Sequence, residues 1–385
     1  MRGREGRPCR RQASIDDALP EAAIESYSAS VHPLEHLGYG PFFSTQLELL
    51  DGAPDLVPAR IAADWGSRYE LLGCQAKVGE LSGTLRRATQ ALARPATGDW
   101  VAVSDGPECA VIHHVLDRKT LLTRRAAGTG GGFLVVAANV DVFFVVTSAN
   151  RDLNPRRIER YLAAVWDSGA TPVVVLNKCD LAEDLPSLIS SIEAVAPSVA
   201  VVAVSAHTGE GMDALSPHLA RDTTVAFIGS SGVGKSSLIN RLFGQPAEQV
   251  GEARSDGKGR HTTTRRQLSV LPSGVLVIDT PGMRELGVAD AELGLDAAFP
   301  EIAALAERCR FGDCQHESEP GCAVRDAAAR GDLGAERLES YRKLRRETAA
   351  ADARSSPALA ANTKRRWKVI HKRMRAFSKS DRKRR

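Results

Sequence analysis

The rhythm of hydrophobic and polar positions changes several times along the chain. Residues 1–40 show no sustained periodicity, and we expect a mostly flexible extension there. Residues 66–126 hold short, partly alternating runs separated by Gly, Pro and Asp turns, a pattern typical of small antiparallel strands. From residue 139, apolar runs of strand length alternate with segments of helical spacing, which predicts a largely parallel sheet covered on both faces. Residues 297–349 have helical spacing around a group of cysteines.

These changes predict five segments. A flexible extension precedes an oligonucleotide-binding (OB) type β-barrel, then an α/β domain, a helical module and a basic tail. Barrel patterning alone is weak evidence for nucleic-acid binding, since a purely structural β domain explains the same residues nearly as well. The predicted boundaries are 1–65, 66–126, 135–290, 291–350 and 351–385.

The α/β segment is the most regular part of the pattern. Its apolar strands alternate with amphipathic helices, and one helix has Pro155 near its start and Gly169 after its end. We expect strands at 140–149, 171–178, 198–206 and 223–230, a hairpin over 266–279, and helices at 154–169, 185–196, 211–220 and 235–244.

Composition narrows the class of protein. The chain has 385 residues, of which 43% are hydrophobic, and no apolar run approaches the ~18 residues that span a bilayer. Seven cysteines, three of them within residues 309–322, do not form the spread of a disulfide framework. The basic first residues lack the apolar stretch of a secretory signal, and Glu5, Asp16 and Asp17 count against an organelle transit peptide. We therefore expect a soluble, cytoplasmic protein.

The net charge of +4 conceals an asymmetry. Residues 362–385 carry twelve Lys/Arg and one acidic residue, so the tail is strongly basic and the rest of the chain is mildly acidic. Cations with interleaved apolar residues favour a helix that forms on a polyanion such as RNA. A solvated end is the next interpretation, and a membrane surface is the third. The interleaved apolar residues are Trp367, Val369, Ile370, Met374 and Phe377.

A phosphate-binding loop lies between the last predicted parallel strand and its helix. The segment GSSGVGKS fits G-x-x-x-x-G-K-[ST] in the strand–helix context that the motif requires. Gly232 and Gly234 let the backbone wrap phosphates, Lys235 brings a charge to the outer phosphates, and the Ser236 hydroxyl can bind Mg²⁺. A ligand-free glycine turn is a poor alternative here. The expected phosphate-binding residues are Gly229, Ser230, Ser231, Gly232, Val233, Gly234, Lys235 (also a catalytic candidate), Ser236 and Ser237.

A base-recognition motif, NKCD, ends an earlier apolar strand. The Asp180 carboxylate can accept from both guanine N1–H and its exocyclic amine, a donor pair that adenine lacks. Asn177 can brace neighbouring loops, and the Lys178 stem can lie over the base. The next strand ends in VSAHTGEG, where the backbone N–H of Ser205 or Ala206 can donate to guanine O6. The base-site candidates are Asn177, Lys178, Cys179, Asp180, Ser205 and Ala206.

The segment VLVIDTPGMRE supplies the remaining nucleotide contacts. Asp279 ends a strand and can hold Mg²⁺ through water, while the Gly282 amide can meet the γ-phosphate. Upstream, the segment GKGRHTTTRR has the glycine, basic and threonine content of a mobile switch. Either Thr263 or Thr264 can complete the Mg²⁺ shell. The expected Mg²⁺ ligands are Ser236, Asp279 and Thr264, with Thr263 as the alternative to Thr264.

The order of these motifs differs from that of an ordinary GTP-binding domain, because the base motifs precede the phosphate loop. Joining the ends of such a fold and cutting it elsewhere gives this order. The chain thus resembles the circularly permuted GTPases, and more specifically the ribosome small-subunit-dependent GTPase A family. The resemblance covers roughly residues 66–345 and rests on GDWV, NKCDL, GSSGVGKSSLIN, GRHTTT, DTPGMRE and CRFGDCQHESEPGCAV. It implies a permuted P-loop GTPase domain between an OB-type barrel and a helical zinc-binding module.

Four metal-ligating side chains are clustered after the GTPase motifs. Cys309, Cys314, His316 and Cys322 have the spacing C-x4-C-x-H-x5-C. Three thiolates and one imidazole make a closed tetrahedral zinc set with no open position for catalysis. Three reduced thiols in a small helical module are the alternative. The family resemblance agrees with one structural Zn²⁺ per chain.

The catalytic water lacks its usual partner. Met283 stands where a water-orienting Gln would follow the strand motif. The resemblance implies that His261, in the switch segment, positions the water instead. A surface histidine is the alternative interpretation of His261.

We expect a GTP hydrolase that acts in late maturation of the small ribosomal subunit, binds ribosomal RNA and is released on hydrolysis. Its partners would be the small subunit with its rRNA, GTP/GDP and Mg²⁺, with no membrane, and the chain would be a monomer. A GTP-regulated RNA-binding switch unconnected with ribosomes is the first rival. A phosphotransferase is the second, and the guanine-specific residues argue against it. Because the switch leads directly into the C-terminal module, nucleotide state can pass to that module along the chain.

Overall fold

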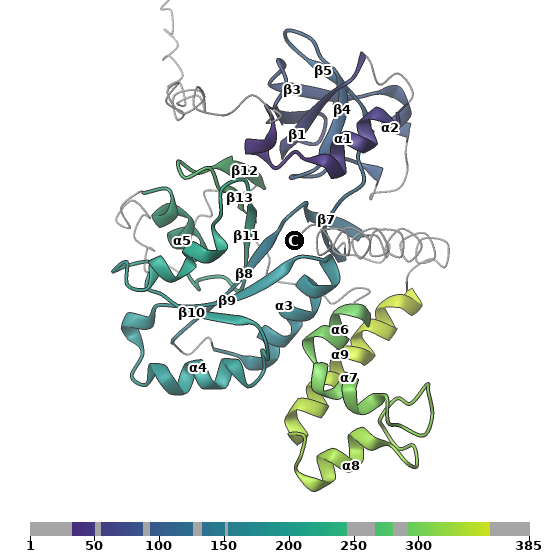
Figure 1. Cartoon of the computed structure of the whole chain (residues 1–385), viewed down its shortest axis with the longest axis vertical. Helices are drawn as coiled ribbons and strands as arrows, with labels where there is room; N and C mark the ends of the chain where they lie inside the picture. The colour runs from purple at the N-terminus through teal and green to yellow at the C-terminus, as the bar shows by residue number, and fades with distance from the viewer. Residues whose placement is uncertain are drawn as a thin grey trace, which may run out of the picture.

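A computed structural model of the chain describes residues 33–50, 55–87, 93–125, 133–150, 153–244, 266–279 and 292–354. In Figure 1 a β-barrel, an α/β domain and a helical module follow one another along the long axis of the molecule. No helix within these residues is long and apolar enough to cross a membrane.

The α/β domain is built on the predicted sheet. Its strands lie in the order β10-β9-β8-β11-β13-β12, parallel except that β12 is antiparallel to β13. Alternate residues of β8 enter separate cores, with Phe143 and Val145 on one face and Phe144 and Val146 on the other. Both faces are thus buried, as the apolar runs predict. The strands are β8 (Val142–Ser148), β9 (Thr171–Asn177), β10 (Ala200–Ala203), β11 (Thr224–Ile228), β12 (Gln267–Val270) and β13 (Leu276–Asp279).

Helices α3 (Pro155–Ser168), α4 (Leu185–Glu193) and α5 (Lys235–Leu242) lie where the pattern predicts them. The predicted helix over 211–220 is instead the 3₁₀ helix η7 (Met212–His218). Pro217 lies inside it, and a proline cannot supply the backbone donor that a longer α-helix needs.

The barrel has five strands and closes on itself. β1 pairs with both β2 and β4, and β3 runs parallel to β5, which confirms the OB-type expectation. The barrel has its own core, which includes Ile61, Tyr69, Leu71, Val101 and Ile112. Helix α2 (Gly83–Arg87) follows β3. The strands are β1 (Val57–Asp64), β2 (Tyr69–Leu72), β3 (Val78–Leu81), β4 (Trp100–Ser104) and β5 (Ala110–Val115).

The barrel begins earlier than residue 66, and this corrects the predicted extension over residues 1–65. Its first strand starts at Val57, and η3 (Glu35–Leu37) and α1 (Pro41–Glu48) precede it. Five consecutive residues of β1 are buried, so the strand lacks the alternation by which a half-exposed strand is recognised. Residues 1–32 lie outside the described part of the chain.

A two-stranded sheet connects the barrel to the α/β domain. β6 (Leu121–Arg125) pairs with β7 (Phe133–Ala138) rather than with the barrel strands. The two large units also touch directly, because Ala63 of β1 pairs with Gln267 of β12. Through this pair the strands of the barrel and of the α/β domain form a single eleven-stranded sheet.

A buried arginine closes the same junction. Arg60 of β1 donates to the carbonyls of Leu37, Gly98 (3.3 Å) and Asn139 (3.2 Å) and to Thr224 Oγ1 (2.9 Å). Burial lowers the pKa of Arg60 to about 10, so the guanidinium stays charged at neutral pH. One side chain therefore bonds the N-terminal segment, the barrel and the α/β sheet.

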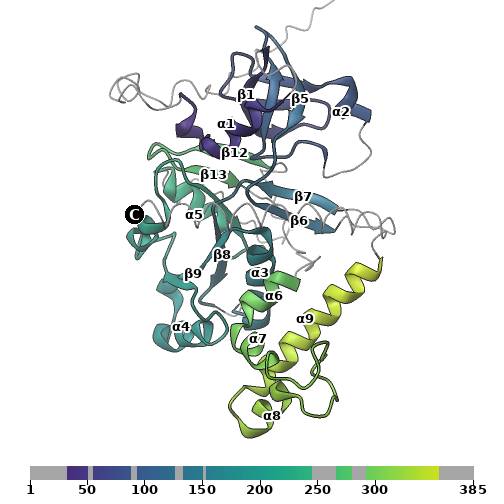
Figure 2. The ribbon, with the colours of Figure 1, turned by 45° about the vertical axis from the view of Figure 1, so that its right-hand side comes forward.

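The helical module packs on one helix of the α/β domain. It consists of α6 (Glu292–Ala298), α7 (Pro300–Ala306), α8 (Ala323–Arg330) and α9 (Ala335–Arg354). Figure 2 shows α6 beside α3, with α9 running past them. Gly294 of α6 approaches α3 so closely that a Cβ there would lie 2.0 Å from the Ala163 carbonyl oxygen. The close approach therefore requires glycine at position 294.

Candidate functional site

The phosphate loop leaves β11 at the carboxyl edge of the sheet, where ligands of such folds bind. Gly229, Gly232 and Gly234 all have positive φ, at 147°, 85° and 95°. A Cβ at Gly229 would lie 2.2 Å from the Val146 carbonyl oxygen, and one at Gly234 would lie 2.2 Å from Asn177 Nδ2. The loop therefore needs glycine both for its backbone conformation and for its close neighbours.

Lys235 begins α5 and turns back over the loop. Its ammonium donates to the carbonyl oxygens of Gly229 at 2.8 Å and Ser230 at 2.7 Å. Phosphate oxygens bound in this loop would compete with those carbonyls for the same charge.

Asn177 joins the base motif to the phosphate loop. Its Nδ2 donates to the Val233 carbonyl at 2.8 Å, and its Oδ1 accepts from the Ala206 amide at 3.0 Å. Its neighbour Lys178 donates from Nζ to the Gly232 carbonyl at 2.8 Å. The structure thus brings three motifs, far apart in the sequence, to one edge of the sheet, and Asn177 braces them as predicted from its position.

The two backbone amides expected at guanine O6 already have partners. The Ser205 amide donates to the Glu210 carbonyl at 2.8 Å, and the Ala206 amide donates to Asn177. Either amide would have to exchange that bond for one to the base. Asp180 follows β9 in the 3₁₀ helix η6 (Cys179–Leu181), and its carboxylate is exposed beyond the strand end.

Cys179 lies between the base-site residues but faces the protein. Its side chain is buried, and its amide donates to the Val204 carbonyl at 3.1 Å. Burial raises the pKa of its thiol, with Glu210 and Asp180 adding to the effect. The Cys179 side chain therefore belongs to the protein interior rather than to the exposed surface of the base site.

Asp279 ends β13 next to the phosphate loop. Burial raises the pKa of its carboxyl group, and the charge of Lys235 opposes that effect, so the two groups are close enough to interact. Ser236 is the second residue of α5. The other predicted nucleotide residues, His261, Thr263, Thr264 and Gly282, lie outside the described residues, as does Met283.

Sequence reasoning missed one contact to the loop. Arg157 of α3 donates from Nη1 to Ser230 Oγ at 2.5 Å. The two residues lie 73 positions apart and belong to no common motif, so only the RR pair at the start of a predicted helix could have suggested it.

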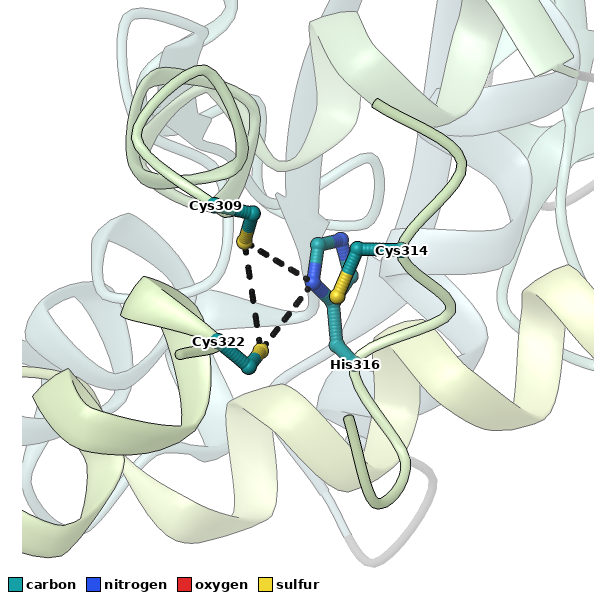
Figure 3. A group of neighbouring side chains, drawn as sticks. All are labelled: Cys309, Cys314, His316 and Cys322. Atoms are coloured by element: carbon teal, nitrogen blue, oxygen red, sulfur yellow. Dashed lines mark hydrogen bonds between the residues drawn. The ribbon is translucent and has the colours of Figure 1, made fainter. Parts of the chain in front are cut away.

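The metal-ligating group is assembled as its spacing predicts. Figure 3 shows the side chains of Cys309, Cys314, His316 and Cys322 converging from the loop between α7 and α8. All four ligand atoms lie within 4.8 Å of one another. Cys314, His316 and Cys322 are buried, and the cysteines are free thiols rather than a disulfide.

The distances in the group fit a tetrahedral metal site. Cys309 Sγ lies 3.9 Å from Cys322 Sγ and 3.6 Å from His316 Nδ1, and Cys322 Sγ lies 3.4 Å from the same nitrogen. Bonds of about 2.3 Å to sulfur and 2.0 Å to nitrogen place tetrahedral ligands about 3.5–3.8 Å apart. The donor set and its geometry therefore suit one tetrahedral ion.

The surrounding residues hold the ligands in place. Arg345 of α9 donates to the Cys314 carbonyl at 3.1 Å, and Arg342 donates to the His316 carbonyl. Burial lowers the pKa of His316, aided by Arg345, which favours the neutral imidazole that binds metals. Burial alone would raise the pKa of Cys309, but amide donors at the start of α8 outweigh it and the pKa is lowered. These two shifts favour the ligand forms, whereas burial, aided by the neighbouring cysteines, raises the pKa of Cys314 to about 11.

Comparison with family models gives two matches. A model described as RsgA GTPase matches residues 115–289, which hold the base motifs, the phosphate loop and the strand of Asp279. A model described as ABC transporter matches residues 212–380, a range that also includes the phosphate loop.

Relatives of the whole chain agree with the first model. The chain is 43% identical over 348 residues to the "Small ribosomal subunit biogenesis GTPase RsgA" of Syntrophotalea carbinolica, covering 88% of this chain and 95% of that protein. It is 49% identical over 262 residues to the protein named "Small ribosomal subunit biogenesis GTPase RsgA 2" of Lactiplantibacillus plantarum, covering 68% of this chain and 74% of the other.

Two solved structures share the fold. YjeQ from Thermotoga maritima superposes with a TM-score of 0.56 at 26% identity, covering 75% of this chain and 97% of its own. YloQ, described as a circularly permuted GTPase, superposes with a TM-score of 0.53 at 26% identity, covering 77% of this chain and 96% of its own. The second of these structures is thus titled with the permuted architecture that the motif order of this chain indicates.

Proposed function

Because the chain belongs to the RsgA GTPase family, we propose that it hydrolyses GTP in the maturation of the small ribosomal subunit. The observation that carries the proposal is the pair of hydrogen bonds made by the Asn177 side chain, which connect the base motif to the phosphate loop and to the loop after β10. A single nucleotide can then bridge the base motif and the phosphate loop. Relatives named for small-subunit biogenesis match this chain over nearly their whole length, which supports a role in small-subunit maturation.

The nucleotide would bind with its base at the end of β9 and its phosphates at the start of α5. Asp180 would accept from the guanine edge, with the stem of Lys178 beside the ring, and Lys235 would neutralise the outer phosphates. Ser236, Asp279 and Thr264 of the switch would hold Mg²⁺, with Thr263 as the alternative to Thr264. The Gly282 amide would meet the γ-phosphate, and His261 would position the attacking water.

The metal in the Cys3His group would be zinc with a structural role. Three thiolates and an imidazole leave no open coordination position, so the ion would stabilise the loop between α7 and α8 rather than activate water. Its binding would fold the loop and fix how that loop is presented to a partner.

On the small subunit, the protein would contact ribosomal RNA. The OB-type barrel, the helical module and the basic tail of residues 362–385 would provide the contacts, and GTP hydrolysis would release the protein. We propose a cytoplasmic monomer that shuttles between free and subunit-bound states.

The deciding experiment is single-turnover GTP hydrolysis with purified small subunits, with large subunits, with protein-free rRNA and with no addition. Of these additions, we expect only the small subunits to stimulate hydrolysis strongly. The Lys235→Ala variant should lose the stimulated activity. Equal stimulation by protein-free RNA would favour a general RNA-binding switch. No stimulation by any of the three would contradict the proposal.

A further inference from the structure

Helix α3 is bonded to the phosphate loop at its first turn. Arg157 donates to Ser230 Oγ at 2.5 Å, while the carbonyl of the same serine accepts from Lys235 at 2.7 Å. Ser230 is therefore held between two cations, one from its own loop and one from a neighbouring helix. Arg157 adds positive charge to the loop and fixes the orientation of its second residue.

The position of Arg157 is set by the way α3 begins. Asn154 is the N-cap, and its Oδ1 accepts from the Arg157 backbone amide at 3.1 Å. Pro155 occupies the first turn, where its fixed φ suits a helix start. The helix start is thus well defined, and a capped first turn presents the Arg157 side chain to the loop in one register.

The same helix is bonded to the helical module that carries the metal ligands. Glu159 is almost fully buried and accepts from Arg337 of α9 at 2.6 Å. Arg337 also donates to Glu301 of α7 at 2.6 Å and lies over the Phe299 ring, with 4.2 Å from its Cζ to the ring centroid.

A second ion pair joins the same two helices. Arg160 of α3 and Glu347 of α9 pair at 3.0 Å on a half-exposed surface. Residues 157, 159 and 160 lie within about 5 Å of one another along the axis, since an α-helix rises about 1.5 Å per residue. A displacement of α9 that moves residues 159 and 160 must therefore move Arg157 as well.

We propose that Arg157 is a positioning residue of the phosphate loop, and that the metal-bearing module sets its position through α3. This route is a set of side-chain contacts on one helix, distinct from the chain connection between the switch and the module. The proposal rests on nucleotide binding by the phosphate loop but on no property of a ribosomal partner. A failure of subunit stimulation would therefore leave it untouched.

The first test is a double-mutant cycle on the full chain, with GTP and GDP affinities measured by equilibrium titration without ribosomal components. Arg157→Met and Ser230→Ala should each weaken binding by about tenfold, the effect of losing one hydrogen bond to a charged group. The double variant should bind no more weakly than Arg157→Met alone. Losses that multiply would show that the two residues act separately and would overturn the first half of the proposal.

Two matched variants separate geometry from charge. Arg156→Met removes the neighbouring, exposed cation of the same turn and should leave affinity within about twofold, as for a surface charge. Arg157→Lys keeps the charge but loses the planar fork, and it should recover only part of the affinity. Full recovery by lysine, or an equal loss on Arg156→Met, would mean that a general positive field is responsible.

The second test asks whether the module acts through Arg157. Arg337→Met should weaken GTP binding several-fold in the wild-type background and should have no further effect in Arg157→Met, because coupled sites lose their linkage when the connecting residue is removed. If Arg337→Met fails to fold, Arg160→Gln breaks the half-exposed pair and serves the same purpose. Equal effects in both backgrounds, or unchanged affinity in a folded variant, would exclude the module from the route.

Discussion

Asn177 shows how one buried side chain can organise a nucleotide site. It is almost completely buried and bonds both the phosphate loop and the loop after β10. Its amide also occupies the space that a Cβ on Gly234 would need, so Asn177 in this position requires glycine at 234. An asparagine at this point supplies one donor and one acceptor in fixed opposition, which aspartate cannot do.

Asp180→Asn should change which base the site prefers. The carboxylate accepts from the guanine amine, whereas an amide can donate to the carbonyl that xanthine carries at the same position. Because Asp180 is exposed, the substitution should leave the fold intact. Competition between GTP and xanthosine triphosphate for the variant checks this, and an unchanged preference for GTP would remove Asp180 from base recognition.

His261→Ala should separate hydrolysis from binding. If the imidazole positions the water, the variant should bind GTP with nearly wild-type affinity but hydrolyse it about 10²-fold more slowly with small subunits present. In the presence of GTP, the variant should also remain bound to the small subunit for longer, because hydrolysis normally releases the protein. Wild-type single-turnover rates in the variant would leave His261 as a residue of the switch surface.

At the residue scale, the sequence motifs predicted the positions of the phosphate-loop glycines and the bracing contacts of Asn177. The glycine positions follow from the loop pattern, since their positive φ allows few other residues, and the Asn177 brace follows from the place of NKCD at a strand end. The contact of Arg157 did not follow, because it depends on how a separate helix is capped and oriented. The hydrogen-bond partners of the Ser205 and Ala206 amides could not be predicted either, since the pattern of side chains in a loop does not determine its backbone hydrogen bonds.

At the scale of elements, prediction succeeded where several local signals agree. Helix α3 has a cap, an early proline and a terminal glycine, and its bounds match the expected 154–169 within a residue at each end. Strand β1 was missed because burial on both faces removes the alternation on which strand recognition depends. The helix expected over 211–220 became 3₁₀ around Pro217.

The metal-bearing loop is the element whose structure depends most on its ligands. Cys314→Ser should lower the metal content below one per chain and loosen the helices packed around the loop, with at most the several-fold loss of GTP affinity expected for Arg337→Met. Metal affinity should also fall as pH is lowered, because the thiols must lose their protons to bind. Elemental analysis and hydrogen exchange check both points.

Cys109→Ser is the matched control, since Cys109 is an exposed thiol in the barrel, far from the cluster in sequence. It should keep the full metal content. A Cys314→Ser protein with unchanged metal content would exclude Cys314 from the ligand set.

At the scale of the molecule, Arg60 bonds parts of the chain that are far apart in sequence. Arg60→Met should destabilise the protein by roughly 2–4 kcal/mol, because four buried acceptors lose their donors while the cost of burying the charge is also removed. Urea unfolding checks the value. Arg68→Gln, which breaks an exposed 3.0 Å pair with Glu80, should cost at most about 0.5 kcal/mol. Equal effects of the two substitutions would contradict the bridging role of Arg60.

The strand order of the α/β sheet also bears on how the chain is made. β8 lies between β9 and β11, but about 75 residues separate its end from Thr224, where β11 begins. At roughly 5–20 residues per second, a ribosome needs several seconds to add them. During that interval the growing chain carries an apolar strand with one edge unpaired, after the barrel has already been completed. The yield of folded protein should therefore depend on translation speed and on chaperones that shield nascent chains.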